Sequence, residues 1–138
     1  MPYKFISHPA DTGIEIEAST LPELFSLALK GFNATIFEKP EAVEVSEEKP
    51  LSVSGEDVKE LLVNFLTEVL TLLDSERFVV DEANFERIDE KNIEAVLKGG
   101  KVDLGKMGFI TEIKAITYHQ LQVEKRGDGW FARVIFDI

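Results

Sequence analysis

The sequence predicts one α+β domain spanning residues 1–138, built as two layers: a largely antiparallel β-sheet with two main helices packed on one of its faces. Three observations lead to this class. Two long segments carry apolar residues at helical spacing, most other apolar residues alternate with polar ones, and the order is strands, helix, strand, helix, then several strands. No linker, low-complexity tract or internal repeat divides the chain, and its length suits a single core.

The two helices are marked by start signals as well as by periodicity. Thr20 can cap the first helix while Glu23 reaches back to the cap amide, and Pro40 closes the segment. The second helix follows residues 54–57, which offer several caps and place acidic side chains well for the helix dipole. The apolar stripes comprise Leu21, Leu24, Phe25, Ala28, Phe32 and Ile36 in the first helix, and Val58, Leu61, Leu62, Phe65, Leu66, Val69, Leu70 and Leu73 in the second.

The strands are expected where apolar and polar residues alternate. Gly99 and Gly100 indicate a break between strands, and residues 126–129 (Arg-Gly-Asp-Gly) indicate a hairpin turn before the last strand. Strand segments are expected at residues 14–18, 43–53 (as one bent strand or two), 78–80, 85–88, 93–97, about 110–124, and 130–138.

The charge balance restricts the classes of partner. The chain carries 26 acidic and 15 basic residues, for a net charge of −11. Such a surface repels a phosphate backbone, so tight direct binding of nucleic acid is not expected, whereas basic proteins and divalent cations are suitable partners. The absence of cysteine excludes disulfides and thiolate metal sites. Neither a signal peptide nor an apolar run long enough to cross a membrane is recognised, so a cytoplasmic protein is expected.

The segment from Ser7 to Gly13 holds the first candidate functional residue, Asp11. In the simplest interpretation, the triplet Asp11-Thr12-Gly13 is a tight turn in which the carboxylate caps the backbone. The same triplet occurs in aspartic proteases, but that chemistry needs a second matching carboxylate motif, or a dimer that supplies one. A single triplet is therefore weak support for a protease.

The end of the chain holds the second candidate, Asp137 with the terminal carboxylate of Ile138. Residues 134–136 are all apolar, which predicts a strand covered on both faces. Two negative groups so close together need a cation, or one of them stays protonated. Oxygen ligands without cysteine favour a hard cation, Ca²⁺ or Mg²⁺. The alternative is a solvated chain end without a ligand.

The third candidate segment runs from Thr111 to His119. In a strand, His119 lies on the apolar face, where a hydrogen-bonded core residue is the simpler interpretation. Lys114 lies on the polar face, where an ion pair with Glu112 or with a residue of a neighbouring strand is expected. No phosphate-binding glycine loop, nucleophile elbow or zinc-ligand spacing is present. The residues alone therefore define an acidic α+β domain with a candidate carboxylate site for a cation, and they contain no recognisable set of catalytic residues.

Three segments, taken together, resemble the archease family. They are His8-Pro9-Ala10-Asp11-Thr12-Gly13-Ile14 near the start, Glu112 to His119 late in the chain, and Val134-Ile135-Phe136-Asp137-Ile138 at the end. The family patterns are approximately His-Thr-Ala-Asp-Ile-Gly, then Glu-Val-Lys-Ala-Val-Thr-Tyr-His, then a terminal Phe-Asp-Val or Phe-Asp-Ile. Pro9 and Thr12 depart from these patterns, and neither change removes a carboxylate. The resemblance covers nearly the whole chain, including its length and its strand–helix order.

The resemblance implies an accessory protein and not an enzyme. Archeases are partners of the RtcB-type, GTP-dependent RNA ligase of tRNA splicing, and they promote its guanylylation and its multiple turnover. The acidic charge of this chain indicates that it meets tRNA only through the ligase. Family members bind Ca²⁺ at positions that correspond to Asp11, Asp137 and Ile138, with Mg²⁺ or a similar divalent cation as the alternative ion. Glu38 and Lys114 correspond to two further positions that are functional in ligase activation.

Two other classes of protein remain open from the residues. An acidic, chaperone-like interaction module would act without metal, so dependence of partner binding on Ca²⁺ or Mg²⁺ separates it from an archease. A small hydrolase could use the carboxylates and a metal ion to activate water. No base beside a substrate pocket is recognisable in the sequence, which disfavours the hydrolase.

Overall fold

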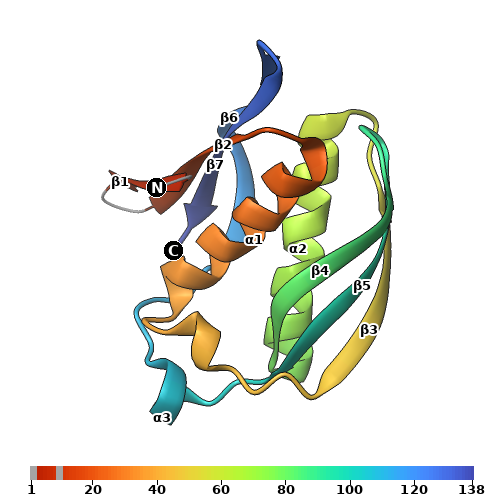
Figure 1. Cartoon of the computed structure of the whole chain (residues 1–138). Helices are drawn as coiled ribbons and strands as arrows, with labels where there is room; N and C mark the ends of the chain where they lie inside the picture. Colours follow the sequence, from red (N-terminus) through yellow and green to blue (C-terminus); the bar gives the residue numbers. More distant parts are fainter. Residues whose placement is uncertain (1–2, 9–10) are drawn as a thin grey trace.

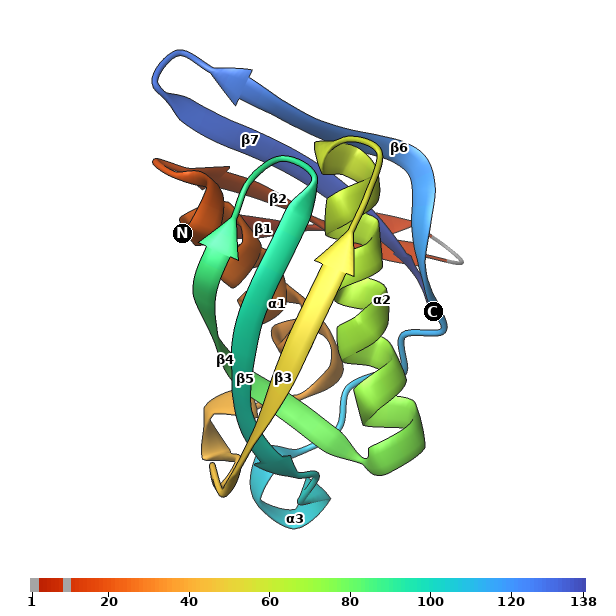
Figure 2. The ribbon, with the colours of Figure 1, turned by 90° about the vertical axis from the view of Figure 1, so that its right-hand side faces the viewer.

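The computed structural model describes residues 3–8 and 11–138, and it consists of two antiparallel sheets with two long helices between them (Figures 1 and 2). The first sheet has the strand order β1 (Tyr3–His8), β2 (Asp11–Ala18), β7 (Gly129–Asp137) and β6 (Ala115–Arg126); the second has the order β3 (Glu47–Ser54), β5 (Asn92–Lys101) and β4 (Phe78–Ile88). The long helices are α1 (Leu21–Ile36) and α2 (Val58–Glu76); a 3₁₀ turn (Pro40–Ala42) and the short α3 (Leu104–Met107) lie in the connections. None of the described helices is long and apolar enough to span a membrane.

The predicted α+β class, with antiparallel strands and two main helices, is confirmed, but the strands form two sheets and each helix contacts both of them. The wide apolar stripes of the helices explain this arrangement, because a stripe that covers much of a helix must be buried on more than one side. On α1, Phe25 packs edge-on against Phe65 of α2 and Phe85 of β4, with ring centroids 5.5 and 6.4 Å apart. One end of the same helix faces the other sheet, where Phe32 packs edge-on against Phe136 of β7 at 6.0 Å.

Both helices begin where the sequence predicts. The Thr20 hydroxyl accepts a hydrogen bond from the Glu23 N–H at 3.3 Å, and the Glu23 carboxylate accepts one from the Ser19 N–H at 2.8 Å, one residue before the predicted partner. Of the several caps offered to α2, Asp57 is the one that is used, since its carboxylate accepts from the Glu60 N–H at 2.9 Å. These bonds satisfy amide groups that the first turn of a helix leaves without a partner.

The predicted break at Gly99 and Gly100 is wrong, because both residues lie inside β5. They are glycine because another segment passes very close: a Cβ at Gly99 would lie 1.8 Å from the Val79 carbonyl oxygen of β4, and one at Gly100 would lie 1.9 Å from that of Glu44. The hairpin turn between β6 and β7 is confirmed, with Gly127 at φ 61°.

The long strand predicted from about residue 110 starts only at Ala115, and its alternation is interrupted. A register shift occurs in the middle of β6, where Gln120 has φ 53°. Extra residues in a bulge reverse which side chains face the core. Ile116 and Leu121 are therefore both buried although they are five positions apart, and His119 is exposed. The expected core position of His119 is wrong for this reason.

Candidate metal site

Three successive cross-strand pairs lie on the face of the four-stranded sheet that points away from the helices. They are Glu15–Arg133, Gly13–Ile135 and Asp11–Asp137, which join β2 to β7. In the first pair, the Arg133 guanidinium donates to the Glu15 carboxylate at 2.8 Å, so opposite charges meet. In the third pair, two carboxylates stand opposite each other. Directly opposed residues have Cβ atoms roughly 4.5–5.5 Å apart, and like charges at that spacing destabilise a sheet. Asp137 is exposed and Asp11 is half-buried, so water solvates the first carboxylate, and a cation beside the pair would reduce the remaining repulsion.

One oxygen of Asp11 strengthens this conclusion. Its Oδ1 atom is buried and has no hydrogen-bond partner within the described part of the chain. A buried carboxylate oxygen without a partner is costly, and in folded proteins a water molecule or an ion normally satisfies such an atom. The predicted tight turn over the triplet 11–13 is wrong, because these residues lie in β2. Pro9 and Ala10, which precede it in the sequence motif, lie outside the described residues.

Gly13 separates the ion pair from the carboxylate pair and has a packing role. A Cβ at this position would lie 2.5 Å from the Val134 carbonyl oxygen and 2.8 Å from the Cδ1 atom of Ile135. Ile135 is only 1% exposed, although it points away from the helices. The glycine of the triplet thus gives the Ile135 side chain room beside the carboxylates.

A cavity of about 380 Å³ adjoins the carboxylate pair. Asp11 and Ile138 both line it, together with Thr12 of β2, Thr35 of α1 and Thr111. The structure thus brings Asp11 and Asp137 together by strand pairing, and Asp11 and Ile138 together by a shared cavity. The three residues predicted for the metal site are therefore neighbours.

Residues 108–114, which we call the strap, run between α3 and β6 without forming a helix or a strand. The Ile110 N–H donates to the Ile36 carbonyl at the end of α1, at 2.7 Å. The Lys114 N–H donates to the Asp137 carbonyl near the end of β7, also at 2.7 Å. The strap therefore ties the last turn of α1 to the carboxylate pair.

Lys114 and Glu38 lie at opposite ends of the strap. Lys114 is exposed and bonded through its backbone to Asp137, while Glu38 is exposed and lies against Gly108. Gly108 has φ 69°, and a Cβ there would lie 2.8 Å from Glu38 Oε1. The structure therefore places Lys114 at the carboxylate pair, and Glu38 does not line the cavity beside it. The predicted ion pair between Lys114 and Glu112 does not form among the described residues.

The carboxylate oxygens at this site are ligands of the type that a hard cation binds. Among the side chains that the structure describes, those of residues 3–6 and 11–138, no group of three or more histidine, cysteine, aspartate or glutamate residues could hold a metal ion. The two aspartates would need a further ligand, and Ile138 lines the same cavity as Asp11, so its carboxylate fits that role where it is the last residue of the chain. Carboxylate oxygens are the ligands that Ca²⁺ and Mg²⁺ prefer. An unpartnered oxygen on Asp11 and an unbalanced carboxylate pair are both features that such an ion would resolve.

The neighbouring ion pair makes a prediction about pH. Hydrogen bonds from Arg133, then from Lys4, lower the pKa of the Glu15 carboxyl below its usual 4.5. A lowered folded-state pKa means that Glu15 stabilises the fold above about pH 4.5, and that this stabilisation is lost as the pH falls through the folded-state pKa. We expect Glu15→Gln to lower the free energy of unfolding at pH 7 by about 1 kcal/mol. Urea unfolding at a series of pH values checks this, and an equal gap between variant and wild type at pH 7 and pH 3 would contradict it.

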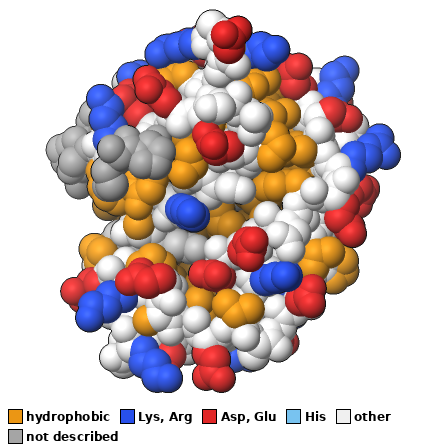
Figure 3. Space-filling model, viewed as in Figure 1, with side chains coloured by type: hydrophobic (Ala, Val, Ile, Leu, Met, Phe, Trp, Pro, Cys, Tyr) orange, Lys and Arg blue, Asp and Glu red, His pale blue; other side chains and the backbone are white. Residues whose placement is uncertain are grey.

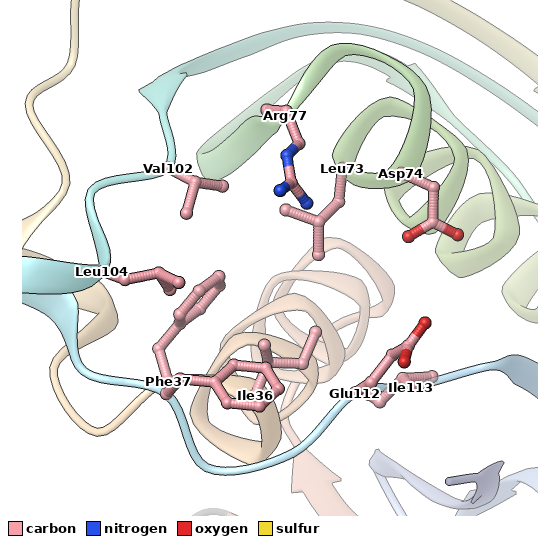
Figure 4. A pocket seen from close by; sticks show the side chains of 10 residues that line it. Ile36, Phe37, Leu73, Asp74, Arg77, Val102, Leu104, Glu112 and Ile113 are labelled. Carbon is pink, nitrogen blue, oxygen red and sulfur yellow. The ribbon is translucent and has the colours of Figure 1, made fainter.

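A second cavity, of about 250 Å³, lies on the other side of the strap, between α2 and the strap (Figure 4). Its walls are mostly apolar, and its charged groups are Asp74, Arg77 and Glu112. Arg77 ends α2 with φ 55°, a backbone conformation that glycine usually takes at this position. The sequence predicts Ile36 and Leu73 on the apolar stripes of the two helices, but it does not predict the cavity that they line.

Fold and site define a class of protein: a small acidic α+β domain, in which two antiparallel sheets enclose two helices and a cross-strand carboxylate pair stands at a strand end. Among solved structures, the chain is similar to the solution structure of protein 1598 from Methanobacterium thermoautotrophicum. That similarity covers 99% of each chain, with a TM-score of 0.79 and 25% sequence identity.

The sequence comparisons specify the family. The archease protein family matches residues 3–138. Curated archeases are similar over nearly their whole length: that of Methanosarcina barkeri is 36% identical, covering 99% of this chain and 95% of its own. The archease of Archaeoglobus fulgidus is 34% identical over the full length of both chains, and that of Pyrococcus furiosus is 34% identical over 99% and 98%. The chain belongs to the archease family.

Proposed function

We propose that this chain activates an RtcB-type, GTP-dependent RNA ligase in tRNA splicing, by promoting guanylylation of the ligase and its multiple turnover. Membership of the archease family supports an accessory role in tRNA splicing in general. Archeases are accessory proteins, which is consistent with a chain that is not itself an enzyme. The observation that carries the finer proposal is the opposed pair of Asp11 and Asp137 with an unpartnered oxygen on Asp11.

In this proposal, Asp11, Asp137 and the carboxylate of Ile138 hold a divalent cation, with Ca²⁺ as the first candidate and Mg²⁺ as the second. When bound, such an ion supplies positive charge that phosphate groups can use. The protein's own part is to fix the two aspartates on adjacent strands. Lys114 adds an exposed cation near them, because its backbone N–H is bonded to the Asp137 carbonyl while its side chain faces solvent. Glu38 acts at the far end of the strap, on the ligase and not on the ion.

The test is ligation by the cognate ligase with GTP, divalent cation and tRNA halves, with and without a catalytic amount of this protein. We expect product to exceed the ligase concentration only when the protein is present, and Asp137→Ala to return the reaction to a single turnover. Asp128→Asn, which removes one negative charge from the hairpin turn, is the matched control and should stimulate like the wild type. No stimulation by folded protein with the correct ligase and metal would overturn the proposal.

A chaperone-like interaction module without metal dependence is the second candidate, because several large apolar side chains are exposed. The two candidates differ in one measurement. Binding of the ligase by an archease should weaken when a chelator removes the divalent cations, whereas binding by a metal-independent module should not change.

A further inference from the structure

Thr35, near the end of α1, is buried although it is polar. Two polar side chains are buried among those that the structure describes, Asn33 at 5% exposed and Thr35 at 6% exposed. The Asn33 carboxamide has a tertiary role, because its Nδ2 atom donates to the Val80 carbonyl of β4 at 2.7 Å. The Thr35 hydroxyl donates only within its own helix, to the Gly31 carbonyl at 2.8 Å.

The hydrogen bond inside α1 does not explain why this residue carries a hydroxyl. Helix geometry already pairs the Gly31 carbonyl with the Thr35 N–H, so this carbonyl has a partner without the side chain. A hydroxyl that bonds to the carbonyl of the preceding turn slightly destabilises a helix. A valine would fill nearly the same space without burying a polar atom. The packing of α1 therefore gives no reason for a threonine at this position.

The cavity beside Asp11 gives a reason, because Thr35 lines it. Four polar side chains lie on its described walls, those of Asp11, Thr12, Thr35 and Thr111, and none of the described lining residues is a lysine, arginine or histidine. The hydroxyl hydrogens of two of them are already used, since Thr12 donates to the Ile6 carbonyl at 2.9 Å and Thr35 donates inside α1. These two hydroxyls can offer the cavity only an acceptor oxygen.

Walls that offer acceptor oxygens suit a cation that keeps part of its water shell. The hydrogens of metal-bound water need acceptors, whereas an anion such as phosphate needs donors. Ca²⁺ takes roughly six to eight oxygen ligands and Mg²⁺ usually keeps several waters, so an ion held by the carboxylates here would also bind water. Figure 3 shows acidic and basic side chains intermixed on the face of the molecule seen in Figure 1. The preference for a cation therefore comes from the cavity walls and not from a surface region of one sign.

We infer that Thr35 is a positioning residue of the cation site, whose hydroxyl oxygen accepts a hydrogen bond from a water molecule bound to the ion. This inference rests on the proposed function, of which the ion is a part. Groups that lie behind the ligands of a metal ion and fix their orientation contribute strongly to its affinity. Because Thr35 is buried in a helix, its hydroxyl is held in one place relative to the cavity.

Calorimetric titration with Ca²⁺, and separately with Mg²⁺, compares the wild type with Thr35→Val, Thr35→Ser and the control Thr71→Val. Thr71 makes the same kind of bond in α2, to the Thr67 carbonyl at 2.9 Å, but it is exposed and does not line this cavity. We expect Thr35→Val to raise the Kd about tenfold, and the other two variants to stay within about twofold of the wild type. With chelator present, Thr35→Val should melt at or above the wild-type temperature, because it loses no tertiary hydrogen bond.

The other outcomes separate this inference from the proposed function. If Thr35→Val binds both ions within about twofold of the wild type, the inference is wrong and the proposed function stands. If Thr35→Val and Thr35→Ser are weakened equally, the shape of the side chain and not its hydroxyl is responsible, and the inference is again wrong. A wild-type protein that binds neither Ca²⁺ nor Mg²⁺ would overturn the metal site of the proposed function, and the role of Thr35 with it.

Discussion

Asp11→Asn should stabilise the metal-free protein and, at the same time, remove most of the stabilisation that Ca²⁺ confers. In the absence of a cation, Asp11 and Asp137 are like charges opposed across two strands. Removing one of them should raise the free energy of unfolding by up to about 1 kcal/mol. A cation that binds only the folded state stabilises it by about 2.7 kcal/mol at a hundred times its Kd. The variant should lose most of that term, because one ionised ligand is gone.

Thermal unfolding with chelator and with saturating Ca²⁺ measures both terms in one series. Asp128→Asn serves as the control, because it removes one negative charge at the exposed hairpin turn and should leave the Ca²⁺ effect unchanged. The prediction is specific because the variant should be more stable than the wild type with chelator and less stable than the wild type with Ca²⁺. If Asp11 has a purely structural role, the variant should be less stable than the wild type both with chelator and with Ca²⁺. If Ca²⁺ does not change the melting temperature of the wild type, the proposed metal site is wrong.

Local signals in the sequence were sufficient for the helices and insufficient for the site. Caps at Thr20 and Asp57, followed by apolar residues at helical spacing, are short-range features, and the structure uses both. The pairing of Asp11 with Asp137 joins residues at the two ends of the chain. No local pattern fixes the register between two such strands. Each aspartate is recognisable in the sequence as a separate candidate. Without the structure, only the resemblance to the archease family indicates that the two belong to one site.

Two wrong predictions, the buried position of His119 and the strand start near residue 110, have the same origin. In both cases the alternation of a strand was extended through residues that do not follow it. The bulge around Gln120 reverses the faces of β6 and leaves His119 exposed. The predicted strand also starts too early, because the Ile110 and Lys114 amides of the strap bond to the ends of α1 and β7 and not to a neighbouring strand along its length. Tertiary hydrogen bonds decide both cases. The feature of the strap that stands out in the sequence is the pair of bulky apolar residues Phe109 and Ile110 directly after Gly108.

The largest loss of stability should follow from Gly99→Ala, far from the carboxylate pair. The added Cβ would lie 1.8 Å from the Val79 carbonyl oxygen and 2.9 Å from the Phe78 ring. The carbonyl belongs to the backbone of the neighbouring strand β4, and Phe78 is completely buried, so neither can move aside cheaply. We expect the free energy of unfolding to fall by about 3 kcal/mol, a large part of the stability of a domain of this size.

Chemical denaturation of Gly99→Ala beside Gly105→Ala isolates this effect. At Gly105, in α3, the nearest atom to an added Cβ is an Asp103 carboxylate oxygen at 3.4 Å, an ordinary contact, so the change should stay within about 0.5 kcal/mol. The same added methyl group is then expected to destabilise the protein strongly at Gly99 and hardly at all at Gly105, and the difference reports how closely the backbones of β4 and β5 approach each other. Equal stability of the two variants would mean that β4 can move away from β5 at Gly99. The three-stranded sheet would then be a looser support for the helices than its packing implies.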